Sequence, residues 1–229
     1  MVMISIEGLD ITYDGLKVNG LLKLPKRLRF NALKIDKMQV GEGEVLAILG
    51  HNGAGKSTLL SAVAGKLRPR RGTISSLGKI VHLSGVNPGF DQHFSPRQNL
   101  VWLSKIYNSD PARIIPEVED FCDIGEAFDR PIRTLSTGMR GRVGFGFATT
   151  LDPDILLIDE VLGVGDPNFK HKATTRLKKL MNETGIVLIS THSVGLVNEL
   201  ATRTIVLRDG GIVHDGEVAE GLSLYSNVK

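Results

Sequence analysis

Residues 45–64 constrain the possible folds of this chain most strongly, because they place a glycine-rich loop between an apolar run and a helix pattern. The apolar run, residues 45–49, is typical of a parallel strand that is buried on both faces. The loop reads G-H-N-G-A-G-K-S and fits the phosphate-binding pattern G-x-x-x-x-G-K-S/T. Residues 58–64 continue as a helix. Strand, loop and helix therefore follow one another in the order that a phosphate-binding loop requires.

The residue types in this loop fit a nucleoside triphosphate and its metal ion. Glycines let backbone N–H groups approach a phosphate closely, and the helix N-terminus adds partial positive charge. We expect Lys56 to reach the β- and γ-phosphates and the Ser57 hydroxyl to bind Mg²⁺. The residues expected to contact the nucleotide are Gly50, His51, Asn52, Gly53, Ala54, Gly55, Lys56, Ser57 and Thr58. A chance match is the alternative, and the flanking strand and helix patterns argue against it.

Length and composition set the broad class. A chain of 229 residues suffices for one sizeable α/β domain with a smaller subdomain. The formal net charge of +3 is too small to indicate nucleic acid, although a mildly basic surface fits work beside anionic lipid. The single cysteine, Cys122, excludes an internal disulfide and favours a buried structural thiol in a reducing cytosol. Without a signal peptide or an apolar run of roughly 20 residues, we expect any membrane role to depend on a partner.

Strand-like runs alternate with helix patterns along the chain, which predicts an α/β fold. Residues 1–7 alternate like an edge strand, and the basic segment 14–40 reads as a solvated hairpin face or, alternatively, a loop that faces a membrane or partner. Later strands are expected at 79–83, 155–158, 186–190, 204–208 and 211–214, and helices at 97–107, 112–122, from 138, 168–181 and from 217. We therefore expect a P-loop NTPase (RecA-like) sheet built from residues 1–85 and 150–229, with residues 86–149 inserted as a helical subdomain.

Two acidic residues follow the predicted strand at 155–158. Asp159 and Glu160 would lie at its carboxyl end beside the phosphate-binding loop, where parallel α/β sheets bind ligands. An aspartate there can hold Mg²⁺ through its water shell, and an adjacent glutamate can polarise the attacking water. His192 follows the strand at 186–190 and would reach the same edge, within reach of the γ-phosphate. Taken alone, Asp159-Glu160 could also be an acidic turn without a function.

The segment Leu135-Ser136-Thr137-Gly138-Met139 lies in the predicted helical part, far along the chain from the phosphate-binding loop. A hydroxyl and N–H groups at a helix N-terminus form an anion-binding arrangement. A second anion site without a second phosphate-binding loop indicates that two protomers share the nucleotide.

Together these motifs resemble the nucleotide-binding subunit of ATP-binding cassette (ABC) transporters over essentially the full length of the chain. The resemblance rests on the phosphate-binding loop, the L-S-x-G-x signature with Arg142, the Asp159-Glu160 pair, Asp166 and His192. It implies an ABC ATPase fold, ATP and Mg²⁺ as cofactors, catalytic roles for Glu160 and His192, and metal binding by Ser57 and Asp159. Further ATP contacts implied by the resemblance are Tyr13, stacked on adenine, Ser136, Thr137, Gly138, Met139, and Asp166 in the loop that crosses the dimer interface.

The same resemblance implies partners and a location. We expect a homodimer bound to two copies of an integral membrane permease, peripheral to the cytoplasmic face of the inner membrane, with no role for nucleic acid. Within the ABC family the chain is most similar to ATPases that export capsular polysaccharide or O-antigen. Residues 135–142 resemble their S-S/T-G-M-x-x-R variant, and residues 158–169 resemble their I-D-E-x-x-x-V-G-D-x-x-F run. This implies export of a lipid-linked polysaccharide through the permease.

Other readings stay open at this point. The chain could export teichoic acid, a lipid or a drug, or it could be a soluble ABC ATPase without a transport role. A P-loop kinase or GTPase is disfavoured, because the sequence lacks the N-K-x-D guanine motif and the Ser136 segment would have no purpose.

Three features depart from the family pattern. The glutamine that senses Mg²⁺ is not evident near residues 84–86. The segment 14–40 is longer than usual, which bears on the role of Tyr13. The sequence stops at Lys229 without the carbohydrate-binding domain of some O-antigen ATPases, so we expect substrate choice to lie mainly in the permease.

Overall fold

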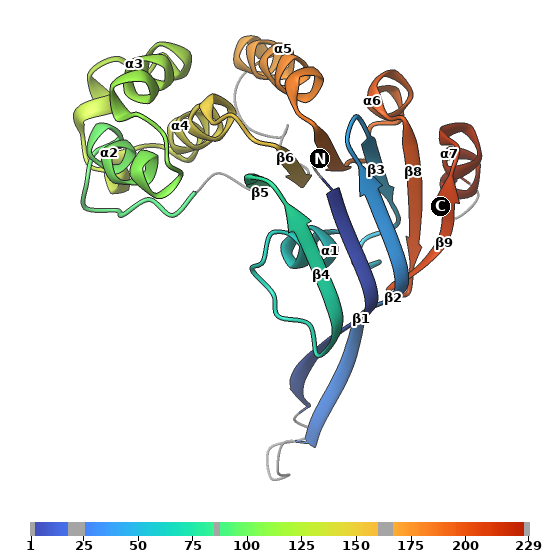
Figure 1. Cartoon of the computed structure of the whole chain (residues 1–229). Coiled ribbons are helices and arrows are strands. Elements are labelled where there is room, and N and C mark those ends of the chain that lie inside the picture. The colour runs from blue at the N-terminus through green and yellow to red at the C-terminus, as the bar shows by residue number, and fades with distance from the viewer. Residues whose placement is uncertain (1–2, 18–25, 85–87, 160–166, 227–229) are drawn as a thin grey trace. The chain divides into compact units, whose positions relative to one another are not determined.

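The structure is a computed structural model that describes residues 3–17, 26–84, 88–159 and 167–226 (Figure 1). The chain forms two compact units. The first combines Met1–Lys79 with Gly185–Lys229, and the second is Ile80–Thr184. The chain therefore leaves the first unit after Lys79 and re-enters it at Gly185.

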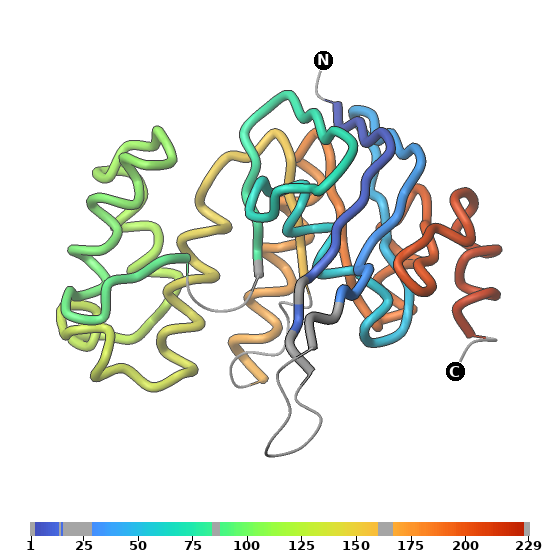
Figure 2. Tube along the Cα trace, turned by 90° about the horizontal axis from the view of Figure 1, so that it is seen from below, coloured from blue at the N-terminus to red at the C-terminus, as the bar shows by residue number. Residues whose placement is uncertain are grey.

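An antiparallel sheet in the first unit has the strand order β2-β1-β4 (Figures 1 and 2). Its strands are β1 (Met3–Lys17), β2 (Lys26–Gly41) and β4 (Arg71–Leu77). The prediction of an edge strand at residues 1–7 is wrong, because β1 pairs with both neighbours and Ile6 lies opposite Met38 on one side and Ile74 on the other. The alternating pattern itself is confirmed, since Ile4 and Ile6 are buried. An alternating pattern indicates which face of a strand is buried, and it does not indicate whether the strand pairs on one side or on both.

The hairpin reading of residues 14–40 is confirmed for the part that the structure describes. β1 and β2 pair antiparallel from Met3↔Gly41 to Lys17↔Lys26, and residues 18–25 lie outside the described ranges. The register shifts after Ile11, where Ile11 pairs with Leu33 and Thr12 pairs with Asn31. Ala32 is thus an extra residue in β2, a β-bulge that changes the direction of the strand locally.

The first unit also contains four more of the described strands and three of the described helices. β3 (Val45–Leu49) pairs in parallel with both β7 (Ile186–Ser190) and β8 (Arg203–Arg208), as its unbroken apolar sequence predicts. β9 (Gly211–Gly216) runs antiparallel to β8. The predicted turn joins them at Asp209 and Gly210, whose positive φ angles of 48° and 79° fit a tight hairpin. The helices of this unit are α1 (Lys56–Val63), α6 (Val194–Leu200) and α7 (Val218–Ser226), of which α6 was not predicted.

The described part of the second unit contains a parallel strand pair and four α-helices. β5 (Ile80–Ser84) pairs with β6 (Ile155–Asp159). The helices are α2 (Pro96–Ile106), α3 (Pro111–Cys122), α4 (Thr137–Thr150) and α5 (Pro167–Glu183). Local sequence signals start two of them, since Ser95 and Gln98 form a capping box at α2 and Asp110 caps α3. The predicted helical part 86–149 lies in this unit, and the predicted division into 1–85 with 150–229 and 86–149 stays a prediction.

Close packing explains one of the glycines that interrupt α4. A Cβ atom on Gly146 would lie 3.1 Å from Phe121 Cδ1 and 3.2 Å from Cys122 Sγ, so glycine lets α3 approach α4. Cys122 is buried in this contact, and burial raises the pKa of its thiol to about 12. The thiol therefore stays protonated at neutral pH, which confirms the expected buried structural thiol.

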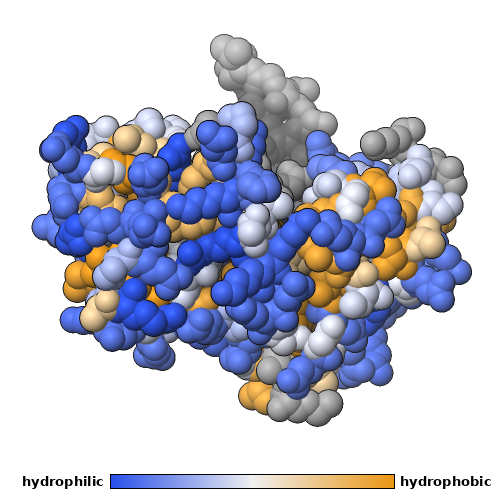
Figure 3. All heavy atoms as spheres, turned by 90° about the horizontal axis from the view of Figure 1, so that it is seen from above, coloured by the Kyte–Doolittle hydropathy of each residue, from blue (hydrophilic) through white to orange (hydrophobic). Residues whose placement is uncertain are grey.

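Polar residues cover most of the surface in one view of the molecule (Figure 3). Hydrophilic residues make up most of the face seen from above in Figure 3, with apolar residues gathered in patches between them. Among the described residues, no helix combines the length and apolar character needed to cross a membrane.

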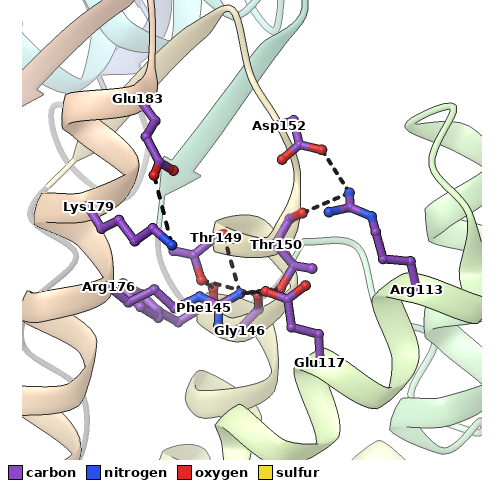
Figure 4. A network of polar contacts seen from close by, with 10 residues as sticks. All are labelled: Arg113, Glu117, Phe145, Gly146, Thr149, Thr150, Asp152, Arg176, Lys179 and Glu183. Atoms are coloured by element: carbon purple, nitrogen blue, oxygen red, sulfur yellow. Dashed lines mark hydrogen bonds and ion pairs between the residues drawn. The ribbon is translucent and has the colours of Figure 1, made fainter.

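Arg176 joins three helices of the second unit (Figure 4). From α5 its guanidinium forms an ion pair with Glu117 of α3, donates to Thr150 Oγ1 of α4 at 2.7 Å, and lies 4.7 Å from the Phe121 ring centroid. The Arg176 side chain is 21% exposed. An ion pair that is partly shielded from water and shares several partners contributes more to the free energy of unfolding than an exposed ion pair does.

We therefore predict that Arg176→Ala lowers the free energy of unfolding by about 2 kcal/mol, because three partners lose their contact at once. Lys179→Ala is the matched control on the same helix. Its ion pair with Glu183 spans 3.9 Å with the lysine 76% exposed, so its loss should cost less than about 0.5 kcal/mol. Urea denaturation of both variants measures the difference, and equal midpoints would contradict the assignment.

Candidate nucleotide-binding site

The loop between β3 and α1 requires glycine at two positions. At Gly50, with φ 149°, a Cβ atom would lie 2.6 Å from the carbonyl oxygen of Leu207. At Gly55, with φ 107°, it would lie 2.7 Å from Leu33 Cδ2 and 2.9 Å from the carbonyl oxygen of Ala32. Both distances are shorter than any ordinary Cβ contact, so the loop can take this course only because these side chains are absent.

The start of α1 leaves N–H groups available to an anion. No side chain caps this helix, and its N-cap residue is Gly55. The first N–H groups of a helix have no partner within the helix, and the helix dipole adds positive charge there. His51, Asn52, Gly53 and Ser57 are exposed, so the loop can be reached from solvent. This arrangement can bind a phosphate group.

Lys56 supplies the charge at this loop. Its side chain is buried, and Nζ donates hydrogen bonds to the carbonyl oxygens of Gly50 at 2.7 Å and His51 at 3.2 Å. Both acceptors are neutral carbonyl groups, and a charged phosphate oxygen would be a stronger partner than either of them. The lysine is therefore positioned over the loop before any ligand binds.

Strand register brings His192 to the same edge as the loop. In the parallel pair of β3 and β7, Ile48 lies opposite Ser190. Gly50 comes two residues after Ile48, and His192 comes two residues after Ser190. Both therefore lie at the carboxyl edge of these strands. His192 is exposed, and its Nδ1 lies 2.6 Å from the hydroxyl oxygen of Tyr225. The position of His192 at this edge agrees with the prediction from the sequence, whereas its contact with Tyr225 was not predicted.

Tyr13 lies on β1 near the contact between β2 and the loop. Tyr13 lies opposite Phe30 of β2. Two residues earlier on β1, Ile11 lies opposite Leu33, which is the residue of β2 next to Gly55. Tyr13 is 44% exposed and Phe30 is 66% exposed. Directly opposite residues of an antiparallel pair point to the same face, so both side chains lie exposed on one face of the hairpin. Phe30 was not singled out from the sequence, because only the strand register reveals it.

The remaining predicted site residues belong to the second unit. Asp159 is the last residue of β6 and is half-buried. Glu160 and Asp166 lie outside the described residues, as do residues 85–87 at the expected position of the missing glutamine. Their predicted roles stay predictions.

The segment from Ser136 to Met139 forms the predicted helix start. Ser136 caps α4, where its hydroxyl oxygen accepts a hydrogen bond from the Met139 N–H at 3.2 Å. Ser136 and Thr137 are exposed, while Gly138 and Met139 are half-buried. An exposed hydroxyl beside the N-terminal N–H groups of a 14-residue helix can bind an anion presented from outside.

Two residues at the ends of the quoted motifs meet in this unit. The guanidinium of Arg142 on α4 lies 4.9 Å from the ring centroid of Phe169 on α5. Phe169 also packs against Phe121 and Phe145, with ring centroids 5.4 and 6.4 Å apart. The contact ties the helix that begins after Ser136 to the helix that begins after Asp166.

The residues also fit the chemistry of magnesium with a nucleotide. The described parts of the chain contain no cluster of three or more His, Cys, Asp or Glu residues that could hold a metal alone. Mg²⁺ commonly binds through one or two carboxylates, waters and substrate phosphates, and a dedicated protein cage is not needed. The predicted ligands, Ser57 on the first turn of α1 and Asp159 at the end of β6, carry oxygen atoms of the kind that Mg²⁺ prefers, and their roles stay predictions.

Residues 33–163 match the ABC transporter family. This chain belongs to the ABC transporter family. It is 37% identical over 191 residues to the ABC transporter protein AbcA of Aeromonas salmonicida, covering 82% of this chain and 62% of that protein. It is 31% identical over 219 residues to the O-antigen export system ATP-binding protein RfbB of Klebsiella pneumoniae, covering 94% of this chain and 88% of that protein.

Further relatives extend the picture. The teichoic acids export ATP-binding protein TagH of Bacillus anthracis is 32% identical over 197 residues, which cover 85% of this chain and 36% of that protein. The chain thus spans less than two thirds of AbcA and about a third of TagH. A solved ATP-binding cassette dimer in a post-hydrolysis state with ADP and Pi superposes with a TM-score of 0.74 at 21% identity, covering 94% of this chain and 98% of that one. This confirms the predicted ABC ATPase fold.

We predict that Lys56→Ala lowers the affinity for ATP about 10- to 100-fold, because phosphate oxygens lose a charge-assisted hydrogen bond. Lys66→Ala is the control, since Lys66 is an exposed lysine just beyond α1 and should leave ATP binding unchanged. Isothermal titration calorimetry measures both. ATP binding to Lys56→Ala at the unmodified affinity would contradict the role of this loop.

Proposed function

We propose that the chain is the ATPase subunit of a transporter that exports a lipid-linked polysaccharide, O-antigen or capsular, through a separate membrane permease. The observation that carries the proposal is the loop from Gly50 to Ser57. Lys56 is held over this loop, and the loop has no room for a side chain at Gly50 or Gly55. The substrate class rests on the O-antigen export relative, which matches 94% of this chain.

Two protomers would bind ATP between them in a head-to-tail arrangement. The exposed hydroxyl of Ser136 and the N-terminus of α4 support a second phosphate contact, supplied by the partner's copy of this segment. Each ATP then lies between one protomer's phosphate-binding loop and the partner's Ser136, Thr137, Gly138 and Met139. ATP binding closes the dimer because each nucleotide bridges the two copies, and hydrolysis opens it.

The catalytic roles follow the chemistry of phosphoryl transfer. Ser57 and Asp159 would hold Mg²⁺, which would supply positive charge beside the phosphates. Glu160 accepts a proton from the attacking water as general base. His192 donates a hydrogen bond to the γ-phosphate from the carboxyl edge of β7, and Asp166 contacts the partner across the interface. Tyr13 stacks on the adenine base from the hairpin.

The partner would be an integral membrane permease present in two copies, with this subunit peripheral to the cytoplasmic face of the inner membrane. The permease converts closure of the dimer into movement of the lipid-linked glycan. Export of a teichoic acid is the second candidate, because the TagH relative carries that name and matches 85% of this chain.

The shared site predicts the behaviour of Ser136→Arg. A bulky cation at the start of α4 should block closure by steric overlap, so ATP hydrolysis falls to background. ATP binding to the monomer should stay unchanged, because the phosphate-binding loop lies in the other unit of the chain. Calorimetry and a phosphate-release assay measure the two quantities. Full hydrolysis by Ser136→Arg would contradict the shared site.

Mixing Ser136→Arg with Lys56→Ala gives the control for that experiment. In a mixed dimer one composite site carries both substitutions and the other carries neither. Hydrolysis should return on mixing if one intact site suffices. Normal ATP-driven dimerisation of Ser136→Arg alone, measured by light scattering, would rule out a role for Ser136 across the interface.

The substrate class predicts which molecule stimulates the purified complex. With the permease in liposomes, a lipid-linked polysaccharide should raise the rate of ATP hydrolysis several-fold over the lipid carrier alone, because cargo binding favours the closed state. Stimulation by a teichoic acid precursor and not by lipid-linked polysaccharide would instead support the second candidate.

A further inference from the structure

The contact between His192 and Tyr225 joins the carboxyl edge of β7 to the last described helix. The Nδ1 atom of His192 lies 2.6 Å from the hydroxyl oxygen of Tyr225, and the two rings stack with centroids 6.3 Å apart at 27°. Tyr225 is 7% exposed, whereas His192 is exposed. A buried phenol thus holds an exposed imidazole through both a hydrogen bond and a ring contact.

Tyr225 is itself held firmly by the way α7 packs. Gly221 lies one turn earlier on the same face of the helix. A Cβ atom there would collide with Thr204 Oγ1 on β8 and would lie 3.1 Å from His214 Cδ2 on β9. Thr204 Oγ1 also donates to the carbonyl oxygen of Glu217 at 3.1 Å, just before the helix begins. The helix therefore cannot shift without breaking its contact with the sheet.

The chemistry of the two rings determines what this contact does. A neutral imidazole carries one proton, so one ring nitrogen donates and the other accepts. A phenol O–H that donates to Nδ1 leaves the proton on Nε2, the nitrogen on the opposite side of the ring. A γ-phosphate oxygen can only accept a hydrogen bond, so the histidine that binds it must be a donor. A Tyr225 hydroxyl that donates to Nδ1 would select the tautomer that can do this.

We infer that Tyr225 is a positioning residue, which fixes the tautomer and the ring orientation of His192 for the γ-phosphate. The inference rests on the proposed role of His192 in hydrolysis and adds the group that prepares it. Through this contact α7 becomes part of the ATPase site without touching the nucleotide. Partners that orient a functional histidine in this way have measurable effects on activity in other sites.

The test is Tyr225→Phe, which keeps the ring and its packing and removes only the hydroxyl. We expect kcat to fall about five- to tenfold while KM for ATP changes less than about twofold, because a lost hydrogen bond of ordinary strength weakens a contact made during hydrolysis. Nitrogen-15 NMR of labelled histidine should show the Nε2–H tautomer for His192 in the unmodified protein and a mixture of tautomers in the variant. Tyr107→Phe, which removes a hydroxyl in the other unit, is the matched control and should change neither.

A merely structural role predicts a different result. In that case Tyr225→Phe would lower the melting temperature and leave kcat and the tautomer of His192 unchanged, which would overturn the inference. In a His192→Ala background, Tyr225→Phe should cause no further loss of kcat. A further loss as large as in the unmodified protein would also overturn it, because Tyr225 would then act elsewhere.

The proposed function fails separately. If His192→Ala keeps the full kcat, His192 has no role in hydrolysis and that part of the proposed function is wrong. The tautomer measured in Tyr225→Phe still decides whether Tyr225 orients the ring.

Discussion

The close approach of β2 to the phosphate-binding loop is the constraint on which the rest of the first unit depends. The carbonyl oxygen of Ala32 lies within 2.9 Å of where a Cβ of Gly55 would be and within 2.7 Å of where a Cβ of Gly210 would be. The neighbouring N–H of Lys34 donates to the Gly210 carbonyl oxygen at 2.8 Å. One bulged strand thus contacts the loop and the β8–β9 turn together, and glycine at both positions makes this possible.

This contact gives the long segment before β3 a structural purpose. In the sequence, residues 14–40 stand out only as a basic stretch longer than the family pattern. In the fold, the second half of that stretch is β2, which supports the loop at Leu33 and carries Phe30 opposite Tyr13. His192, held by Tyr225, follows β7 and lies at the carboxyl edge of the parallel strands, beside the phosphate-binding loop. The proposed site in this unit therefore draws on the hairpin, the central strands and α7, and no motif in the sequence linked α7 to it.

Local signals made much of this predictable. The buried strands, the turn at Asp209 and Gly210, the helix start at Ser136 and the phosphate-binding loop each depend on neighbouring residues, and each appears as expected. Contacts between distant segments could not be read in this way. β1 lies in the middle of its sheet because β4 pairs with it some 70 residues later, and Tyr225 lies 33 residues from His192. α6, with seven residues, is too short to give a clear periodic pattern.

The central claim is that two copies of this chain share each ATP. A structure of the Glu160→Gln variant with ATP and Mg²⁺ tests it most directly, because loss of the general base should preserve the bound nucleotide. We expect a dimer in which the γ-phosphate contacts Lys56 of one protomer and lies within about 3.2 Å of the hydroxyl of the partner's Ser136. ATP bound by the loop of one protomer with the partner's Ser136 remote from it, or a monomer saturated with ATP, would contradict the account.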